Sequence, residues 1–318
     1  MTLIDVHDLT RTFVVRKRTN GLTRTRTEVR AVHDLSFSVE TGEMVGYIGP
    51  NGAGKSTTIK MLTGILVPTA GHLRVAGLEP SRQRTELARR IGVVFGQRTT
   101  LWWDLPLRDS FELLQKIYRV EPARHRRNLE EYVELLDLGD LLDTPVRQLS
   151  LGQRMRGDIT AALLHDPEIL YLDEPTIGLD VVSKGRLREF LRTLNAERGT
   201  TLMLTTHDLQ DIEQLCSRVM VIDHGSLVYD GPLTGLHAQG GSSRTLVVDL
   251  VDALPDGDRI AVDGATVRKV DGPRQWLSFP TEASAAPLVA AVTAAYDVAD
   301  LSILEPAIED VIADLYAR

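Results

Sequence analysis

The chain has 318 residues, of which 43% are hydrophobic and 25% charged, so its length allows one large domain with a smaller one, or two ordinary domains. Its formal net charge of −8 argues against binding along a nucleic-acid backbone, and its single cysteine, Cys216, excludes an internal disulfide bond. The N-terminal residues MTLIDVHDL lack the basic and apolar regions of a signal peptide, and no apolar run reaches the roughly 20 residues of a membrane-spanning helix.

The first predicted elements are a strand, a glycine-rich loop and a helix. Val29–Val39 roughly alternates apolar and polar residues and Glu43–Ile48 is short and apolar, so both predict strands. The second strand must end at Gly49–Gly52, because Pro50 lacks a backbone N–H donor and glycine permits positive φ. Ser56–Leu66 then carries apolar residues at helical spacing. This order of elements is the one in which phosphate-binding loops occur.

Helices and strands continue to alternate as far as residue 235. Predicted helices cover Asp109–Tyr118, Asn128–Leu136, Gly152–Leu164 and Asp208–Cys216. Predicted strands cover Glu168–Leu172, Thr200–Thr205, Arg218–Asp223 and Ser226–Asp230, the last two as a hairpin. Strands that alternate with helices predict a largely parallel sheet covered on both faces, and therefore an α/β fold.

A change in composition predicts a second domain. Small residues at Gly235–Ser243 indicate a linker, so we expect domains at residues 1–235 and 244–318, joined by residues 236–243. The predicted strands after the linker are Arg244–Leu250, Ala265–Val270, Gln275–Phe279 and Leu301–Leu304, and the predicted helices are Ser284–Tyr296 and Pro306–Ala317. This is the pattern of a small α+β domain. It has no evident group of catalytic or metal-ligating residues, and we expect it to serve packing and dimer support.

The glycine-rich loop matches the pattern G-x-x-x-x-G-K-[ST]. It consists of Gly49, Pro50, Asn51, Gly52, Ala53, Gly54, Lys55, Ser56 and Thr57. Glycines let backbone N–H groups turn toward phosphate oxygens, and the following helix presents its positive N-terminal end. Lys55 supplies a full charge to the β- and γ-phosphates, and the Ser56 hydroxyl can bind Mg²⁺. Between a strand and a helix, the loop predicts a nucleotide-binding site rather than an ordinary glycine turn.

Two adjacent acids, Asp173 and Glu174, follow the predicted strand Glu168–Leu172. Successive side chains on a strand point in opposite directions, so the two carboxylates can have separate tasks. Transfer of a phosphoryl group to water requires one carboxylate near Mg²⁺ and another near the attacking water. Two acids at a strand end are ordinarily a solvated edge, but in the same chain as a phosphate loop they predict a functional pair.

Together with a third motif, these residues resemble the ATP-binding cassette (ABC) ATPases. Leu149-Ser150-Leu151-Gly152-Gln153 is similar to the family signature L-S-G-G-Q, with Leu151 in place of the first glycine. The resemblance implies that Ser150, Gly152 and Gln153 contact the ATP held by a second subunit. Because Leu151 adds no charge, we expect it to leave that site intact.

The resemblance covers roughly Leu3–Pro232 and implies further roles position by position. Gln97 matches the Q-loop glutamine, which binds Mg²⁺ and senses the transporter. His207 matches the switch histidine, which contacts the γ-phosphate. Gly178-Leu179-Asp180 resembles the D-loop, which communicates across the dimer. Phe13 fits the aromatic residue that stacks on adenine, although an insertion lengthens its distance in sequence from the phosphate loop.

The resemblance also implies a fold and a mechanism. The fold is a P-loop NTPase (RecA-like) core with the ABC antiparallel β-subdomain and a helical subdomain at about residues 98–165. Two copies close head to tail around two ATP molecules, each held between the loop of one copy and the signature of the other. The implied catalytic residues are Glu174, His207 and Lys55, and the implied Mg²⁺ ligands are Ser56, Gln97 and Asp173.

A single cassette followed by a small domain resembles the ATPase subunit of ABC-2 type exporters. The sequences FGQR at residues 95–98 and LSLGQR at residues 149–154 strengthen this likeness. It implies an ABC-2 type membrane permease as partner, a peripheral position at the cytoplasmic face of the cell membrane, and a cargo that the ATPase does not contact. One alternative is a soluble ABC ATPase of translation or DNA maintenance, although such chains typically carry two cassettes or a long coiled coil. A second alternative is a regulatory module that binds nucleotide without hydrolysing it. The presence of Glu174 and His207 argues against this alternative.

Two features have two interpretations each. The basic insertion Val14–Arg30, with a predicted turn at Asn20-Gly21, is either a solvated face or a contact with lipid headgroups or the membrane partner. Trp102 and Trp103 are either an anchor for the coupling helix of the membrane subunit or part of the interior of the helical subdomain.

Overall fold

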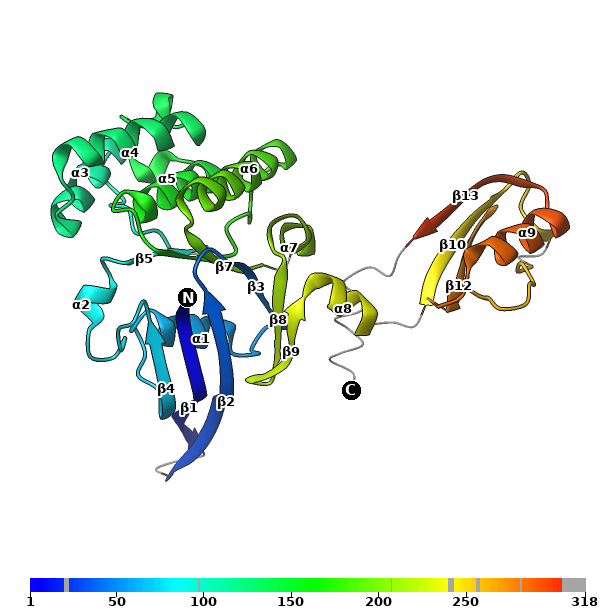
Figure 1. Cartoon of the computed structure of the whole chain (residues 1–318), viewed down its shortest axis with the longest axis horizontal. Helices are drawn as coiled ribbons and strands as arrows, with labels where there is room; N and C mark the ends of the chain where they lie inside the picture. Colours follow the sequence, from blue (N-terminus) through cyan, green and yellow to red (C-terminus); the bar gives the residue numbers. More distant parts are fainter. Residues whose placement is uncertain are drawn as a thin grey trace. The chain divides into compact units, whose positions relative to one another are not determined.

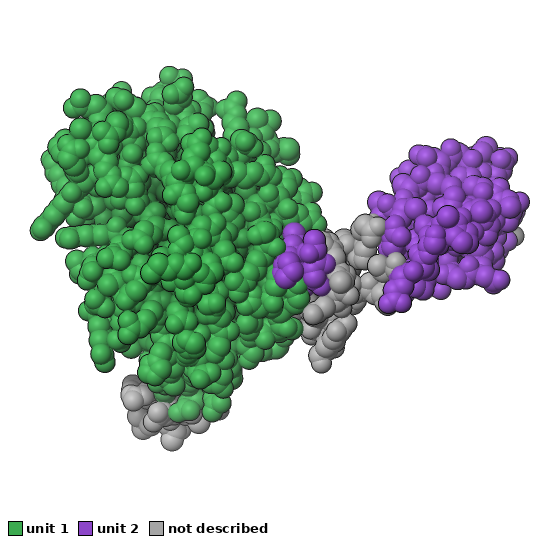
Figure 2. Space-filling view, viewed as in Figure 1, with its two compact units in different colours: residues 1–231 green, residues 232–318 purple. Residues whose placement is uncertain are grey.

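The structure of the chain is a computed structural model. It describes residues 1–19, 23–96, 98–206, 208–239, 243–255, 258–280 and 282–304, and for residues 16–19, 23–26 and 237–239 it describes the backbone only. The chain divides into two compact units, Met1–Gly231 and Pro232–Arg318 (Figure 2). Each unit is described by itself below.

A central sheet of the strand order β5-β6-β7-β3-β8-β9 forms the middle of the first unit. Its strands are β3 (Met44–Ile48), β5 (Ile91–Phe95), β6 (Ile169–Asp173), β7 (Thr201–Thr205), β8 (Arg218–Asp223) and β9 (Ser226–Pro232). The neighbours from β5 to β8 pair in parallel, as the alternation of strands and helices predicts. Their residues are nearly all buried, which is usual where helices cover a parallel sheet.

Helices connect these strands and cover the sheet. The described helices of the first unit are α1 (Lys55–Leu62), α2 (Arg84–Leu87), α3 (Leu107–Tyr118), α4 (Pro122–Leu135), α5 (Leu151–Leu163), α6 (Val181–Arg198) and α7 (Leu209–Leu215), with short 3₁₀ turns η1 (Gly139–Leu141) and η2 (Val146–Gln148). In Figure 1, α3, α4, α5 and α6 lie together on one side of the central sheet, and α1 lies on the other. Of these, α6 corresponds to none of the helices that the sequence analysis predicts.

A second, antiparallel sheet has the order β2-β1-β4 and consists of β1 (Thr2–Thr19), β2 (Thr23–Glu40) and β4 (Ala70–Val75). Strands β1 and β2 pair along their length as far as Thr19 opposite Thr23, so the basic insertion lengthens this pair of strands. The turn predicted at Asn20-Gly21 lies outside the described residues.

One hydrophobic core joins the two sheets through α1. Ile59, Met61 and Leu62 of this helix are fully buried in a cluster that includes Tyr47 of β3 and Val75 of β4. The hydroxyls of Tyr47 and Thr58 form a buried hydrogen bond of 3.1 Å. Packing on both sides therefore holds the first turn of α1 in place directly after the glycine-rich loop.

The second unit contains an antiparallel sheet of the order β11-β12-β10-β13. Its elements are α8 (Leu233–Gln239), β10 (Ser243–Leu250), β11 (Thr266–Asp271), β12 (Arg274–Pro280), α9 (Ala285–Ala295) and β13 (Val298–Leu304). Leu288 and Val292 of α9 pack with buried sheet residues such as Leu246 and Leu277. The helix predicted at Pro306–Ala317 lies outside the described residues.

The predicted linker at residues 236–243 differs from the structure, in which α8 continues to Gln239. The small residues of this segment suggest an irregular chain. However, Leu233 and Leu236 stand at helical spacing and Leu236 is fully buried, which gives a short helix its apolar anchor.

None of the helices in the described part of the chain combines the length and the hydrophobicity needed to cross a lipid bilayer.

The core assignment predicts a large effect for a substitution in α1. Ile59→Ala should lower the free energy of unfolding by about 2–5 kcal/mol, because this fully buried side chain would leave a cavity. Ile117→Ala is the matched control: Ile117 of α3 is 58% exposed, so its loss should change the free energy by less than about 0.5 kcal/mol. Urea unfolding of both variants measures the difference, and equal effects would contradict the assigned core.

Candidate active site

The glycine-rich loop passes so close to two strands that a side chain would not fit at Gly49 or at Gly54. A Cβ atom added to Gly49 would lie 2.4 Å from the carbonyl oxygen of Ile222 in β8, and one added to Gly54 would lie 2.5 Å from that of Ala31 in β2. Gly54 also has a φ of 105°, which favours glycine, and it is the residue before α1. Backbone contacts with β2 and β8 thus fix the course of the loop.

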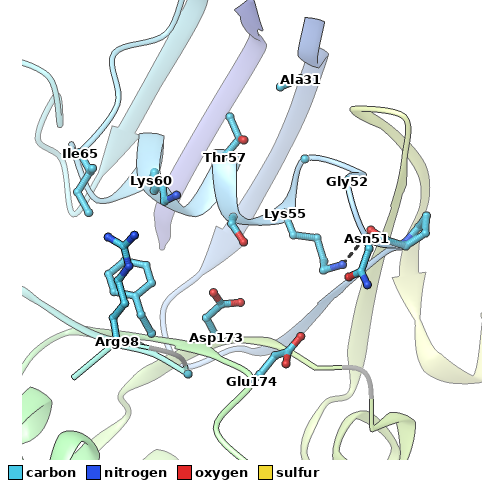
Figure 3. Close-up of a pocket in the computed structure, with 15 residues that line it drawn as sticks. Ala31, Asn51, Gly52, Lys55, Thr57, Lys60, Ile65, Arg98, Asp173 and Glu174 are labelled. Carbon is cyan, nitrogen blue, oxygen red and sulfur yellow. Dashed lines mark hydrogen bonds between the residues drawn. The ribbon is translucent and has the colours of Figure 1, made fainter. Parts of the chain in front are cut away.

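A pocket of about 500 Å³ opens beside this loop (Figure 3). Lys55, Ser56 and Thr57 line it from the first turn of α1, and Asp173 and Glu174 line it from the end of β6. The other lining residues are Ala31, Pro50, Asn51, Gly52, Gly54, Lys60, Ile65, Phe95, Gly96 and Arg98. The structure therefore brings the predicted loop and the predicted acids into one cavity.

The ammonium group of Lys55 lies against the backbone of the glycine-rich loop. It donates hydrogen bonds to the carbonyl oxygens of Gly49 and, over 3.1 Å, Pro50. Burial lowers the pKa of Lys55, and the nearby carboxylates of Glu174 and Asp173 oppose this by raising it. An anionic phosphate placed here would likewise favour the charged form of the lysine.

The chain around β6 directs both acids toward the loop (Figure 3). The hydroxyl of Thr205 in β7 donates a hydrogen bond of 2.5 Å to Asp173, and the backbone N–H of Gly96 donates one of 2.8 Å to the carbonyl of Asp173. Glu174 has a φ of 55°, in the left-handed region that few non-glycine residues adopt. Its N–H donates to the carbonyl of Thr205 over 2.8 Å, which holds this unusual conformation.

The signature residues form the start of α5 and do not line the pocket. Ser150 caps the helix: its hydroxyl accepts a hydrogen bond from the N–H of Gln153 over 3.2 Å, and the side chain of Gln153 accepts one from the N–H of Ser150 over 2.8 Å. Both side chains are exposed or half-buried, so this end of α5 is accessible from outside.

Leu151, the departure from the family signature, packs on the predicted D-loop. A Cβ added to Gly178 would lie 2.4 Å from a methyl group of Leu151, and one added to Gly152 would lie 2.7 Å from a methyl group of Leu179. The leucine side chain thus occupies space that the absence of a side chain at Gly178 leaves open. Within one chain, the signature and the D-loop form a single packed surface.

The remaining predicted residues lie away from the pocket or outside the described part. Asp180 caps α6, where its carboxylate accepts hydrogen bonds of 2.9 and 2.7 Å from the N–H and hydroxyl of Ser183, and these bonds lower the pKa of Asp180. Phe13 of β1 is half-buried and does not line the pocket, and the guanidinium of Arg11 lies 4.7 Å from its ring centre. Gln97 and His207 fall outside the described residues.

The pocket also contains residues that the sequence analysis does not single out. Lys60 and Arg98 add positive charge to its lining. Arg98 directly follows the predicted Q-loop glutamine, and Lys60 lies five residues after Lys55 on α1, so position next to known motifs is the signal that could have identified them. Two further cations suit a ligand with several phosphates.

The described residues contain no group of three or more His, Cys, Asp and Glu side chains that could hold a metal by themselves. Ser56 and Asp173 nevertheless line the same pocket. A hydroxyl and a carboxylate are ligands suited to Mg²⁺, which is usually bound by one or two protein groups together with phosphate oxygens and water.

Known proteins are similar to this chain in sequence and fold. A family model described as ABC transporter matches residues 32–177. The daunorubicin resistance ATP-binding protein DrrA3 of Streptomyces coeruleorubidus is 34% identical over 290 residues, which cover 90% of this chain and 91% of that protein. The Nod factor export ATP-binding protein I of Paraburkholderia xenovorans (strain LB400) is 40% identical over 212 residues, which cover 66% of this chain and 69% of that protein.

A solved structure of a dimeric ATP-binding cassette, in a post-hydrolysis state bound to ADP and Pi, resembles this chain with a TM-score of 0.64. It is 26% identical, and the match covers 72% of this chain and 98% of that one. The α/β P-loop fold expected from the sequence is confirmed by this likeness and by the sheet order. The chain therefore belongs to the ABC transporter family of ATP-binding proteins and is an ATPase of that family.

Proposed function

We propose that this ATPase works as a head-to-tail dimer of two copies and powers a membrane exporter. The observation that carries the dimer is the separation of two parts of one site. Lys55, Asp173 and Glu174 line one pocket, whereas the signature residues Ser150 and Gly152 lie outside it. A second copy that presents its signature to this pocket would complete the site.

In the proposed complex the phosphates of ATP lie along the loop Gly49–Thr57. The N-terminal end of α1 and the charge of Lys55 offset the negative charge of the phosphates. Ser56, Asp173 and Gln97 would hold Mg²⁺, which when bound supplies positive charge that neutralises the phosphate oxygens. Ser56 and Asp173 both line the pocket, whereas the role of Gln97 as a Mg²⁺ ligand is inferred from the family resemblance.

Glu174 is the proposed general base for hydrolysis. Its carboxylate lines the pocket on the side opposite α1, where it can accept a proton from water that attacks the γ-phosphate (Figure 3). Lys55 would stabilise the charge that develops on the γ-phosphate, together with His207, whose part rests on the family resemblance. The main-chain hydrogen bond from Glu174 to Thr205 keeps the base oriented before ATP arrives.

Export is proposed from the relatives. One is named for daunorubicin resistance and another for Nod factor export. Both names favour a transporter over the alternative of a soluble ABC ATPase of translation or DNA maintenance. The proposed partner is an ABC-2 type membrane permease, which would hold this chain at the cytoplasmic face of the membrane.

Two exposed tryptophans support a contact with that permease. The side chains of Trp102 and Trp103 are 38% and 51% exposed, so neither is buried within the helical part of the unit. Tryptophan is enriched at the energetically important centres of protein interfaces. We therefore favour the first of the two interpretations, in which these residues anchor a segment of the membrane subunit.

Removal of the proposed base should abolish turnover but not binding. Glu174→Gln should reduce the rate of phosphate release roughly 10²- to 10⁴-fold, because the amide cannot accept a proton, while ATP binding persists. Glu168→Gln is the control that should retain activity, because Glu168 directly precedes β6 at the end away from Glu174 and its side chain is 49% exposed. Turnover by Glu174→Gln at the rate of the unmodified chain would exclude this role.

Mixed dimers test the composite site. Lys55→Ala and Ser150→Arg should each be inactive alone, because each removes one half of both sites. Mixed in equal amounts, they should recover about a quarter of the unmodified rate, because half of the dimers then contain one intact site out of two. Phosphate release measures the recovery. An inactive mixture in which mass measurements nevertheless show mixed dimers would contradict the head-to-tail arrangement.

A further inference from the structure

The segment that carries the two exposed tryptophans, residues Thr99–Pro106, is here called the Trp loop. It follows the Q-loop in sequence and lies just before α3. Several of its hydrogen bonds are with the part of the chain that surrounds the signature. These contacts come from η2, which ends two residues before Ser150, and from α5, which begins one residue after it.

Asp158 of α5 makes the most unusual of these contacts. Its side chain is only 6% exposed. One carboxylate oxygen, Oδ1, accepts hydrogen bonds from the Thr99 hydroxyl over 2.9 Å, the Thr100 N–H over 2.9 Å and the Thr100 hydroxyl over 3.1 Å. Burial raises the pKa of Asp158, and these hydrogen bonds lower it. A buried carboxylate is costly unless it is well satisfied, and here a single oxygen ties the helix to the loop.

Other contacts join the same two segments. The N–H groups of Val146 and Arg147 donate hydrogen bonds of 3.0 Å to the carbonyls of Leu105 and Trp103. The guanidinium of Arg147 pairs with Asp104 over 2.8 Å, and that of Arg154 lies 5.6 Å from the ring centre of Trp103. The Trp loop is therefore held from both sides of the signature.

The packing between α5 and the Trp loop is close as well as polar. A Cβ atom added to Gly157 would lie 3.1 Å from a methyl group of Leu101 in the Trp loop. It would lie 3.0 Å from a methyl group of Leu107, the first residue of α3. Both leucines are buried. The glycine thus lets the Trp loop lie directly against the helix, one residue before the anchor at Asp158.

We propose that Asp158 is a positioning residue that makes the Trp loop move with the signature. When the N-terminal end of α5 engages ATP bound to a second copy, the helix carries Trp102 and Trp103 with it and changes the surface that they present. From Leu151 to Asp158 the helix rises by roughly 10 Å, and a hydrogen-bonded helix of this length transmits displacement as a rigid body. This inference rests on the proposed head-to-tail dimer.

The geometry distinguishes this path from a path through the Q-loop alone. Gln97 precedes the Trp loop in sequence, and the family resemblance implies that it senses ATP held by the same copy. Asp158 connects the Trp loop to Ser150, which would report on ATP held by the other copy. The exposed tryptophans would then respond to closure of the dimer and not merely to occupancy of one site.

Tryptophan fluorescence tests the proposal on the full chain. The chain has three tryptophans, so Trp276→Phe leaves only Trp102 and Trp103 as reporters. With Glu174→Gln to prevent hydrolysis, addition of ATP and Mg²⁺ should change the emission in parallel with dimer formation. Adding Asp158→Ala should abolish most of this change while the affinity for ATP, measured by equilibrium dialysis, is retained. Asp158→Asn should preserve the change, because its amide oxygen still accepts from Thr99 and Thr100.

Two further variants keep the test decisive. Asp166→Ala is the matched control, because Asp166 also accepts several hydrogen bonds in the helical part of the unit, from Asn128, Arg124 and Arg198, but none from the Trp loop. It should leave the fluorescence change intact. If Asp158→Ala fails to fold, the pair Thr99→Val and Thr100→Val removes two of the three donors without removing the carboxylate, and should reduce the change.

The outcomes separate the inference from the function on which it rests. A full fluorescence change in a folded Asp158→Ala chain overturns the inference, as does an equal loss in Asp166→Ala, which would indicate general loosening. A reference chain that binds ATP and dimerises without any change in emission also overturns it. A reference chain that binds ATP but remains monomeric overturns the proposed dimer, and the inference with it.

Discussion

The position of the phosphate loop is set by the close backbone contacts at Gly49 and Gly54. The carbonyls of Ile222 and Ala31 approach so closely that a Cβ at either glycine would overlap them. This contact holds the loop against β8 and β2, so that α1 begins with Lys55 in the pocket. The parallel sheet then places the ends of β5 and β6 at the same edge, because Phe95 pairs in register with Asp173. The positive charge of Lys55 and the two carboxylates therefore meet in one pocket.

The same geometry explains why one chain is only half of the proposed site. Ser150 is the cap of α5, and its hydroxyl and N–H are engaged with Gln153 on an accessible surface. Leu151 fills the space above Gly178, which joins this surface to the D-loop. A substitution that departs from the family pattern is thus matched by a glycine elsewhere in the chain. In the proposed dimer a second copy binds this accessible surface, and the hydrogen bonds of Asp158 connect it to the segment that carries the exposed tryptophans.

Local sequence motifs are sufficient to predict the phosphate loop, the two acids and the α/β fold. The phosphate loop is one short segment and the acids at the end of β6 are another, and the structure brings the two segments into one pocket. Helix α6 is not among the predicted helices, because charged residues interrupt its apolar pattern, although Leu187, Phe190, Leu191 and Leu194 stand at helical spacing and are buried. The contacts of Asp158 with Thr99 and Thr100 join residues nearly 60 positions apart and leave no pattern in the sequence. The same is true of Leu151 against Gly178, since such pairs arise only when the chain folds.

The most direct test of the account is the dependence of ATP turnover on the concentration of the chain. The rate of phosphate release per chain at saturating ATP and Mg²⁺ should be compared, over a dilution series, with the fraction of dimer measured on the same samples by mass photometry. A composite site predicts that the rate per chain falls with dilution in proportion to the dimer fraction. A rate per chain that stays constant while the dimers dissociate would show that one copy is sufficient and would contradict the account.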